Sequence, residues 1–240
     1  MSEWKARRFW KEAAPEAREG GFGVTLDGRA VMTPGKQPLI LPTEGLAQAI
    51  AAEWDAQAEV IRPETMPLTR AANSAIEKVA PQFSAVADML AEYGATDLLC
   101  YRAESPAALV ARQAAWDEWL DWAADDLGAR LRVTQGVIPI AQDGPALSRL
   151  RARLDGLSPF GLTALHDLVT LPGSLILGLA VIEGRLDAER AFALSRIDED
   201  FQAEHWGLDP EAAEAAAARL TAMRDAERLW QLLGEHGNAS

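Results

Sequence analysis

Residues 174–182 read Ser-Leu-Ile-Leu-Gly-Leu-Ala-Val-Ile, a stretch without a charged side chain. A helix made of these residues has no polar face, and a helix that is apolar on all sides is buried among other elements. The stretch is also far shorter than the roughly 20 residues that a membrane-spanning helix needs. We therefore expect residues 175–182 to form the central helix of a water-soluble helical bundle.

Further helices are predicted around this centre by N-cap residues and prolines at helix starts and by glycines at helix ends. Residues 131–139 fit a strand or an irregular crossing equally well. The expected helices start at Pro81, Ser105-Pro106, Ser158-Pro159 and Asp209-Pro210, and the first, second and last of them end at Gly94, Gly128 and Gly234.

The first third of the chain predicts a small sheet. Residues 23–26 and 29–33 flank Asp27-Gly28, a pair that suits a two-residue type I′ hairpin turn. Residues 37–41, between two proline-containing turns, give a third short strand. Three strands of this size need another element to cover their apolar face.

A helix over residues 44–59 is the expected cover, with Thr43 in its N-cap position. Its apolar stripe consists of Leu46, Ile50 and Trp54, spaced four residues apart. The fold class is therefore α+β. Residues 1–66 are expected to form a small β-rich N-terminal domain with one covering helix, and residues 67–240 a larger all-helical domain.

The charge and the cysteine content limit the cellular compartments and the classes of binding partner that fit this chain. The 240 residues include 23 basic and 36 acidic side chains, and the net charge of −13 opposes binding to nucleic acid and to anionic membranes. Cys100 is the only cysteine, so no disulfide can form within the chain. Residues 1–19 lack the apolar core of a signal peptide and are too acidic for a mitochondrial presequence. We expect a soluble cytoplasmic protein.

Catalytic and metal-binding arrangements are scarce. The three histidines lie far apart without metal-ligand spacing, and His166, within an apolar helix, is expected in the core. Cys100 has apolar neighbours and is expected to be buried rather than nucleophilic. The glycine cluster at residues 20–23 lacks the lysine of a phosphate-binding loop and precedes a strand. No cofactor and no metal are expected.

Residues 193–207 read Ala-Leu-Ser-Arg-Ile-Asp-Glu-Asp-Phe-Gln-Ala-Glu-His-Trp-Gly and predict one amphipathic helical segment. Leu194, Ile197 and Phe201 form its buried side, which leaves Glu199 nearly opposite the core. Adjacent carboxylates repel one another in a helix. The run Asp198-Glu199-Asp200 is therefore either a solvated surface, as charge runs commonly are, or a binding surface.

The geometry of this segment favours binding over catalysis. Successive side chains on a helix point about 100° apart, so the three carboxylates cannot converge on one substrate atom. Asp198 and Gln202 share one flank, and Arg196 and Asp200 pair on the other. Trp206 is expected to fall after the helix, immediately before Gly207, where its ring is either packed or exposed for a partner. The stripe formed by Trp116, Trp119 and Trp122 is expected to lie in the core.

The pattern Leu-Ser-Arg-x-(acid)-Glu-(acid)-(aromatic)-Gln-x-x-x-Trp-Gly at residues 194–207 resembles the signature of the assembly chaperones that bind the alpha subunit of F-type ATP synthase. Similar blocks lie in the same order at residues 23–55, 66–73 and 97–123. Aspartates stand at 198 and 200, where glutamates are common in the family. Aspartate keeps the negative charge of glutamate, but its side chain is shorter.

The resemblance implies an ATP-independent binding protein and not an enzyme. Such a chaperone holds the free alpha subunit before it meets the beta subunit, and it shields an apolar assembly face that would otherwise self-associate. A bacterial member is expected to be cytoplasmic and monomeric when free, whereas the family's eukaryotic members are mitochondrial. The partner-binding residues are then expected to be Asp198, Glu199, Asp200, Gln202 and Trp206.

Two other classes of function remain open. A small-molecule hydrolase or lyase would use carboxylates near the acidic segment, in a site assembled from distant residues. A structural subunit of a larger complex would stay in the finished assembly, whereas a chaperone would leave it.

Overall fold

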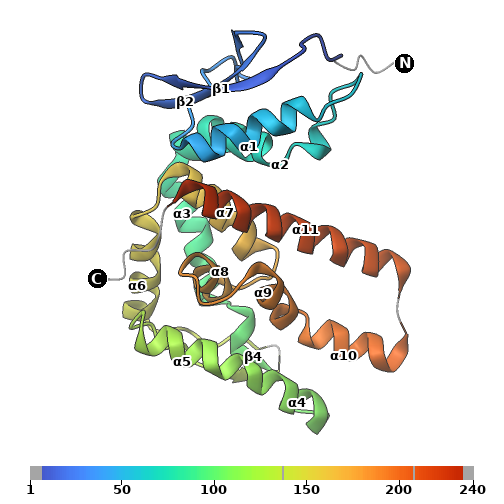
Figure 1. Ribbon diagram of the computed structural model, residues 1–240. Coiled ribbons are helices and arrows are strands. Elements are labelled where there is room, and N and C mark those ends of the chain that lie inside the picture. The colour runs from blue at the N-terminus through green and yellow to red at the C-terminus, as the bar shows by residue number, and fades with distance from the viewer. Residues whose placement is uncertain (1–6, 137, 208, 235–240) are drawn as a thin grey trace.

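The structure is a computed structural model that describes residues 7–136, 138–207 and 209–234 (Figure 1). A small antiparallel sheet near the N-terminus lies over a pair of helices, and the rest of the chain is a layered helical body (Figure 1). The expected α+β fold is confirmed. The division into domains at residues 66 and 67 stays a prediction.

The sheet is built around the expected hairpin. Asp27 and Gly28 both have positive φ, 48° and 78°, as a type I′ turn requires. The strand expected at 29–33 is only two residues long, and residues 37–41 contribute isolated bridges rather than a strand. The strands, in the order β1-β2-β3, are β1 (Ala13–Arg18), β2 (Gly21–Leu26) and β3 (Arg29–Ala30).

Helix α1 (Glu44–Asp55) covers the sheet as expected. Thr43 Oγ1 accepts a hydrogen bond from Leu46 N at 3.2 Å, which confirms the N-cap. The helix ends four residues before the predicted residue 59 because the side chain of Gln57, 4% exposed, turns back into the structure. There it donates to Glu53 O and Thr65 Oγ1 and organises the loop that follows.

The stripe on α1 is buried, and its last member makes an aromatic contact. Leu46 and Ile50 are fully buried, and Trp54 is half-buried with its ring 5.3 Å from that of Trp10. We expect Trp54→Arg to lower the free energy of unfolding by about 2 kcal/mol, because the apolar contact is lost while the guanidinium reaches water. Trp54→Phe, which keeps a ring against Trp10, is the control and should cost less than about 1 kcal/mol. Equal urea midpoints for the wild type and Trp54→Arg would contradict a covering role for this side chain.

The helix expected from Pro81 to Gly94 is α3 (Phe83–Glu92), whose start and end lie within two residues of the predicted ones. It follows α2 (Pro67–Ser74), a π-helical turn at Ala75–Val79 and a 3₁₀ turn at Ala80–Gln82, and the non-helical dihedral angles of Gln82 separate it from them. In the π-helical turn Ala80 N donates to Ala75 O, five residues back. This wider turn accommodates Pro81, which lacks an N–H and would clash in a regular helix.

The apolar helix α8 (Leu175–Ile182) is confirmed as the centre of the helical part, since every one of its residues is buried. The helix expected from Pro106 to Gly128 is two helices joined by a 3₁₀ turn at Ala114–Trp116. The remaining helices are α4 (Ala107–Gln113), α5 (Asp117–Asp125), α6 (Gly144–Asp155), α7 (Pro159–Thr170), α9 (Ala188–Ser195), α10 (Ile197–Trp206) and α11 (Pro210–Leu233).

The structure places a short strand in the connection at residues 131–139 and shows where the last helix ends. The undecided region 131–139 contains β5 (Thr134–Gln135), which pairs in parallel with β4 (Tyr101–Arg102). The last helix ends at Gly234, as predicted, with φ of 64°. Within the described part of the chain, no helix is long and apolar enough to cross a membrane.

Candidate partner-binding surface

The segment expected to be one helix over residues 193–207 is two helices. Helix α9 ends at Ser195, whose hydroxyl donates to Phe192 O at 2.8 Å, and Arg196 has non-helical dihedral angles. Helix α10 then begins at Ile197. The serine hydroxyl satisfies a carbonyl of the last turn of α9 and helps to end that helix, so the single-helix prediction was wrong.

This break explains how α10 tolerates three adjacent carboxylates. Asp198, Glu199 and Asp200 occupy its first turn, where the positive end of the helix dipole stabilises negative charge. Arg196 adds a second stabilising contact, since its guanidinium lies 3.0 Å from Asp200 and 4.0 Å from Glu199. The predicted pairing of Arg196 with Asp200 is confirmed.

The predicted site residues differ in their exposure. Glu199, Asp200 and Gln202 are exposed, and the Trp206 side chain is 81% exposed. Asp198 is half-buried, and its Oδ1 accepts a hydrogen bond of 2.7 Å from Gln113 Nε2. Asp198 is therefore held against the body of the protein, while the other four residues project from α10.

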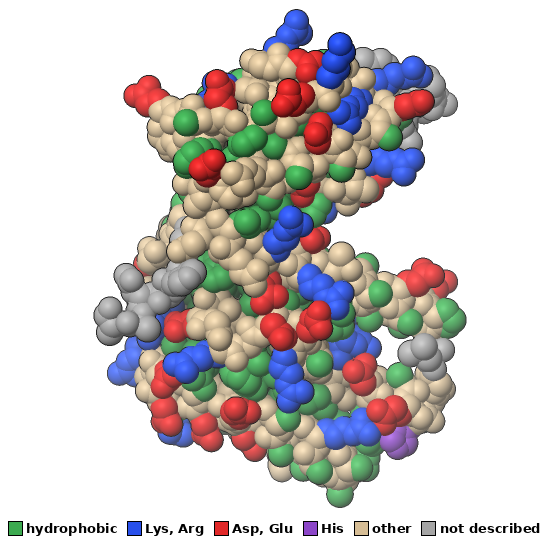
Figure 2. Space-filling model, in the orientation of Figure 1, with side chains coloured by type: hydrophobic (Ala, Val, Ile, Leu, Met, Phe, Trp, Pro, Cys, Tyr) green, Lys and Arg blue, Asp and Glu red, His purple; other side chains and the backbone are tan. Residues whose placement is uncertain are grey.

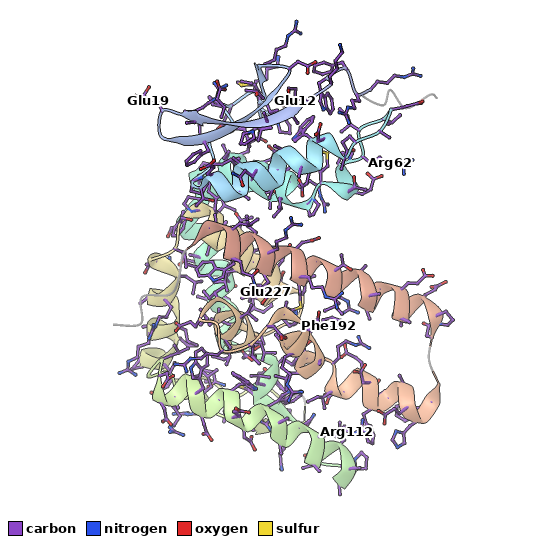
Figure 3. All side chains as sticks on the ribbon, viewed as in Figure 1. Glu12, Glu19, Arg62, Arg112, Phe192 and Glu227 are labelled. Atoms are coloured by element: carbon purple, nitrogen blue, oxygen red, sulfur yellow. The ribbon has the colours of Figure 1, made fainter. Side chains whose placement is uncertain are left out.

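Helix α4 supports α10 from below. Gln113 of α4 is 1% exposed and joins the two helices through its bond to Asp198. Its Oε1 accepts a hydrogen bond from Ala103 N at 2.8 Å, which ties it to the loop before α4. The neighbouring Arg112 donates two hydrogen bonds to the carboxylate of Glu204, at 2.9 and 2.6 Å. Figure 3 shows the Arg112 side chain between α4 and α10. The guanidinium holds the pKa of the Glu204 carboxyl below its usual value.

The apolar side chains predicted to face the core do so, although they lie on two helices. Leu194 of α9 and Phe201 of α10 are buried, and Ile197 of α10 packs against the core. The Phe201 ring lies between the Arg112 guanidinium, 5.2 Å away, and the stacked ring of His205, 4.1 Å away. Trp206 lies beyond this packed region at the outer end of α10. The outer ends of α10 and α11 stand away from the rest of the molecule (Figures 1 and 2).

The supporting residues Arg112 and Gln113 were not predicted as part of the surface. Arg112 and Glu204 lie 92 positions apart, so no local pattern connects them. The position of Gln113 could have been inferred, because it stands three residues before the buried Trp116 and residues at this spacing share one face of a helix. Basic and acidic side chains are interspersed over the face shown in Figure 2.

The expected core residues are confirmed with one exception. Trp116 and Trp119 are buried, Trp122 packs against the core, and burial raises the pKa of the Cys100 thiol to about 12, which keeps it unreactive. His166 was expected in the core but is half-exposed, with Nδ1 2.8 Å from Asp167 Oδ1, because its position on α7 faces a surface pocket. No group of potential metal ligands is found within residues 7–136, 138–207 and 209–234.

Comparisons with known proteins agree with the motifs. A family model described as ATP12 chaperone protein matches residues 7–124. The crystal structure of Atp12 from Paracoccus denitrificans has a TM-score of 0.93 and 66% identity, over 96% of this chain and 100% of that chain. A protein of Agrobacterium tumefaciens has a TM-score of 0.91 and 44% identity, over 95% and 86% of the two chains.

A curated relative extends the comparison to eukaryotes. The mitochondrial protein atp12 of Schizosaccharomyces pombe is 28% identical over 223 residues, which are 87% of this chain and 76% of that protein. The matched relatives are chaperones and not hydrolases or lyases, which removes the support for the enzymatic alternative. The chain therefore belongs to the ATP12 chaperone family, the assembly chaperones of ATP synthase that its motifs resemble.

Proposed function

We propose that this chain binds the free alpha subunit of F-type ATP synthase, shields its assembly face from self-association and releases it during assembly of the catalytic head. The observation that carries the proposal is the outer face of α10, where Trp206 is 81% exposed beside the exposed Glu199 and Gln202. A large exposed aromatic with charged neighbours is the composition of an interface hot spot and its rim.

The way α10 is held supports a binding role for this face. Bonds from Arg112 and Gln113 fix the inner side of the helix, so Glu199, Gln202 and Trp206 are presented without further ordering of the backbone. A preorganised surface loses less conformational entropy on binding. Carboxylates on the rim would steer association with a basic patch on the alpha subunit and would be screened by salt.

We further propose that the cycle uses no nucleotide of the chaperone's own. The glycine cluster at residues 20–23 runs from the turn after β1 into the first residues of β2, and a Cβ on Gly21 would lie 2.3 Å from Leu41 O. Close backbone packing therefore explains this cluster without a phosphate ligand. The proposal includes a cytoplasmic location in a bacterium and a monomeric state before the partner binds.

Charge reversal at Glu199 tests the α10 surface. We expect Glu199→Lys to weaken capture of isolated alpha subunit about tenfold, because rim charges set association rates and like charges across an interface repel. The thermal melt should change little, since Glu199 is exposed and its nearest cation is 4.0 Å away. The matched control is Glu92→Lys, an exposed acid of α3 with the same change of charge.

Truncation of the aromatic tests the anchor. Trp206→Ala should also weaken capture at least tenfold, because exposed aromatic anchors dominate interface energies. Binding assays with wild type, Glu199→Lys, Glu92→Lys and Trp206→Ala separate the possibilities. If both α10 variants capture alpha subunit as well as the wild type does, the acidic segment is only a solvated surface.

A further inference from the structure

A pocket of about 460 Å³ lies outside the α10 surface, between α2, the π-helical turn, α3, α7 and α11. These helices stack in the middle of the molecule (Figure 1), and none of the pocket's lining residues belongs to α4 or α10. Pockets of this volume can accept one or two side chains of a protein segment. Neither the motif around the acidic segment nor the family comparison accounts for it.

The floor of the pocket is apolar. Val79 and Leu229 are buried there, and Val86 and Met89 of α3 are partly exposed toward the opening. A methionine in such a floor can adjust its shape to different side chains. The floor therefore suits an apolar anchor residue from a partner.

The rim carries charges of both signs, and its acidic residues include Asp167 of α7, which lies 2.8 Å from His166 Nδ1. Arg70 and Lys78 stand on the α2 side and are exposed, while Asp225 stands on α11. None of these three takes part in an ion pair with the described residues. Burial raises the pKa of the Asp225 carboxyl, against the opposing influence of Arg228 and Arg70. Charged groups that make no direct ion pair around an apolar floor can still form one with a ligand.

We propose that this pocket is a second docking point for the alpha subunit, which it holds by one apolar side chain of a client segment. An acidic residue of that segment would face Arg70 and Lys78, and a basic residue would face Asp225. This inference rests on the proposed function. The charge arrangement favours such a segment over a uniformly charged ligand, because α2 and the π-helical turn contribute basic side chains to the lining while α7 and α11 contribute acidic ones.

Helix α11 connects the α10 surface to the pocket. Its N-terminal end follows α10, and its C-terminal half forms one wall of the pocket. From Pro210 to Asp225 the helix rises roughly 23 Å at 1.5 Å per residue, a span that one folded client can bridge. Two separate contacts with one client raise the overall affinity without new chemistry at either.

Filling the pocket tests the inference. Ala222 lines the pocket and is partly exposed, so Ala222→Trp should occupy the space that the client side chain needs. We expect this variant to bind isolated alpha subunit about tenfold more weakly than the wild type, with an unchanged thermal melt. The matched control is Ala85→Trp, which adds the same ring at an exposed position of α3 outside the pocket and should bind like the wild type.

A second variant keeps the test valid if the added tryptophan disturbs the fold. Arg70→Glu combined with Lys78→Glu changes only exposed side chains and should also weaken binding. Wild-type affinity in both the filled and the charge-reversed variants would overturn the pocket inference while leaving α10 capture standing. Failure of the wild type itself to bind alpha subunit would instead contradict the proposed function. Self-association of the wild type that Ala222→Trp abolishes would assign the pocket to a second copy of this chain and also overturn the inference.

Discussion

Replacing Asp97 by alanine is expected to lower the free energy of unfolding by about 4 kcal/mol, the largest effect of any single change considered. Asp97 is fully buried, and its carboxylate accepts hydrogen bonds from Ser174 Oγ at 2.7 Å, Leu99 N at 3.1 Å and Ile176 N at 3.0 Å. Two of these donors belong to the start of the central helix α8. Alanine would leave all three buried and without a partner, which is the costly case for polar groups.

The asparagine variant separates the charge from the hydrogen bonds. Burial raises the pKa of the Asp97 carboxyl from 3.8 to about 6, although the surrounding donors act in the opposite direction. A raised folded-state pKa contributes stability that is present below about pH 4 and is lost as the pH rises through about 6. The advantage of wild type over Asp97→Asn should therefore grow by up to roughly 3 kcal/mol between pH 7 and pH 4. Urea titrations at both pH values measure this difference, and a constant difference would show that the charge carries no such cost.

Gln113→Leu is expected to lower the free energy of unfolding by about 3 kcal/mol and to weaken alpha-subunit capture as well. Leucine has a similar volume, but it leaves the half-buried Ala103 N without an acceptor and the half-buried Asp198 carboxylate without its donor. The first turn of α10 would then lose its fixed position against α4. Capture should fall more than the fraction of unfolded protein explains, because the exposed face of α10 is no longer preorganised.

Asp198→Asn is the control for this effect. An amide oxygen can still accept from Gln113 Nε2, so we expect a stability within about 1 kcal/mol of the wild type and nearly normal capture. Urea denaturation and binding assays at a temperature where both variants are folded supply the comparison. Normal capture by folded Gln113→Leu would mean that the tie between α4 and α10 serves stability alone.

The sequence predicted those elements whose signals are local. Thr43, Asp27-Gly28, Gly234 and the apolar run of α8 act through neighbouring backbone, and all four were found where they were expected. Strand β1 was missed because most of its residues are exposed and one is proline, so no alternating apolar pattern marks it. Arg112 and Gln113 support the candidate site from 92 and 85 positions away; no local pattern reveals these contacts, although the spacing of Gln113 from Trp116 indicates that the glutamine faces inward.

The rules for helix ends placed the start of α3 within two residues, at Pro81, but they failed at Arg196. Residues 193–207 were read as one helix because their apolar residues keep a helical spacing across Arg196. The break at Arg196 changes the interpretation of the acidic triplet, since in the first turn of a helix such charges are stabilised by the helix dipole.

The measurement that tests the central claim most directly is size-exclusion chromatography with light scattering on isolated alpha subunit, with and without this chain. The account predicts a one-to-one complex in place of alpha-subunit aggregates, much less of it with Trp206→Ala, and loss of the chaperone from the complex when beta subunit is added. Alpha subunit that aggregates equally with and without the chain would contradict the account, as would a chain that stays bound in the finished assembly.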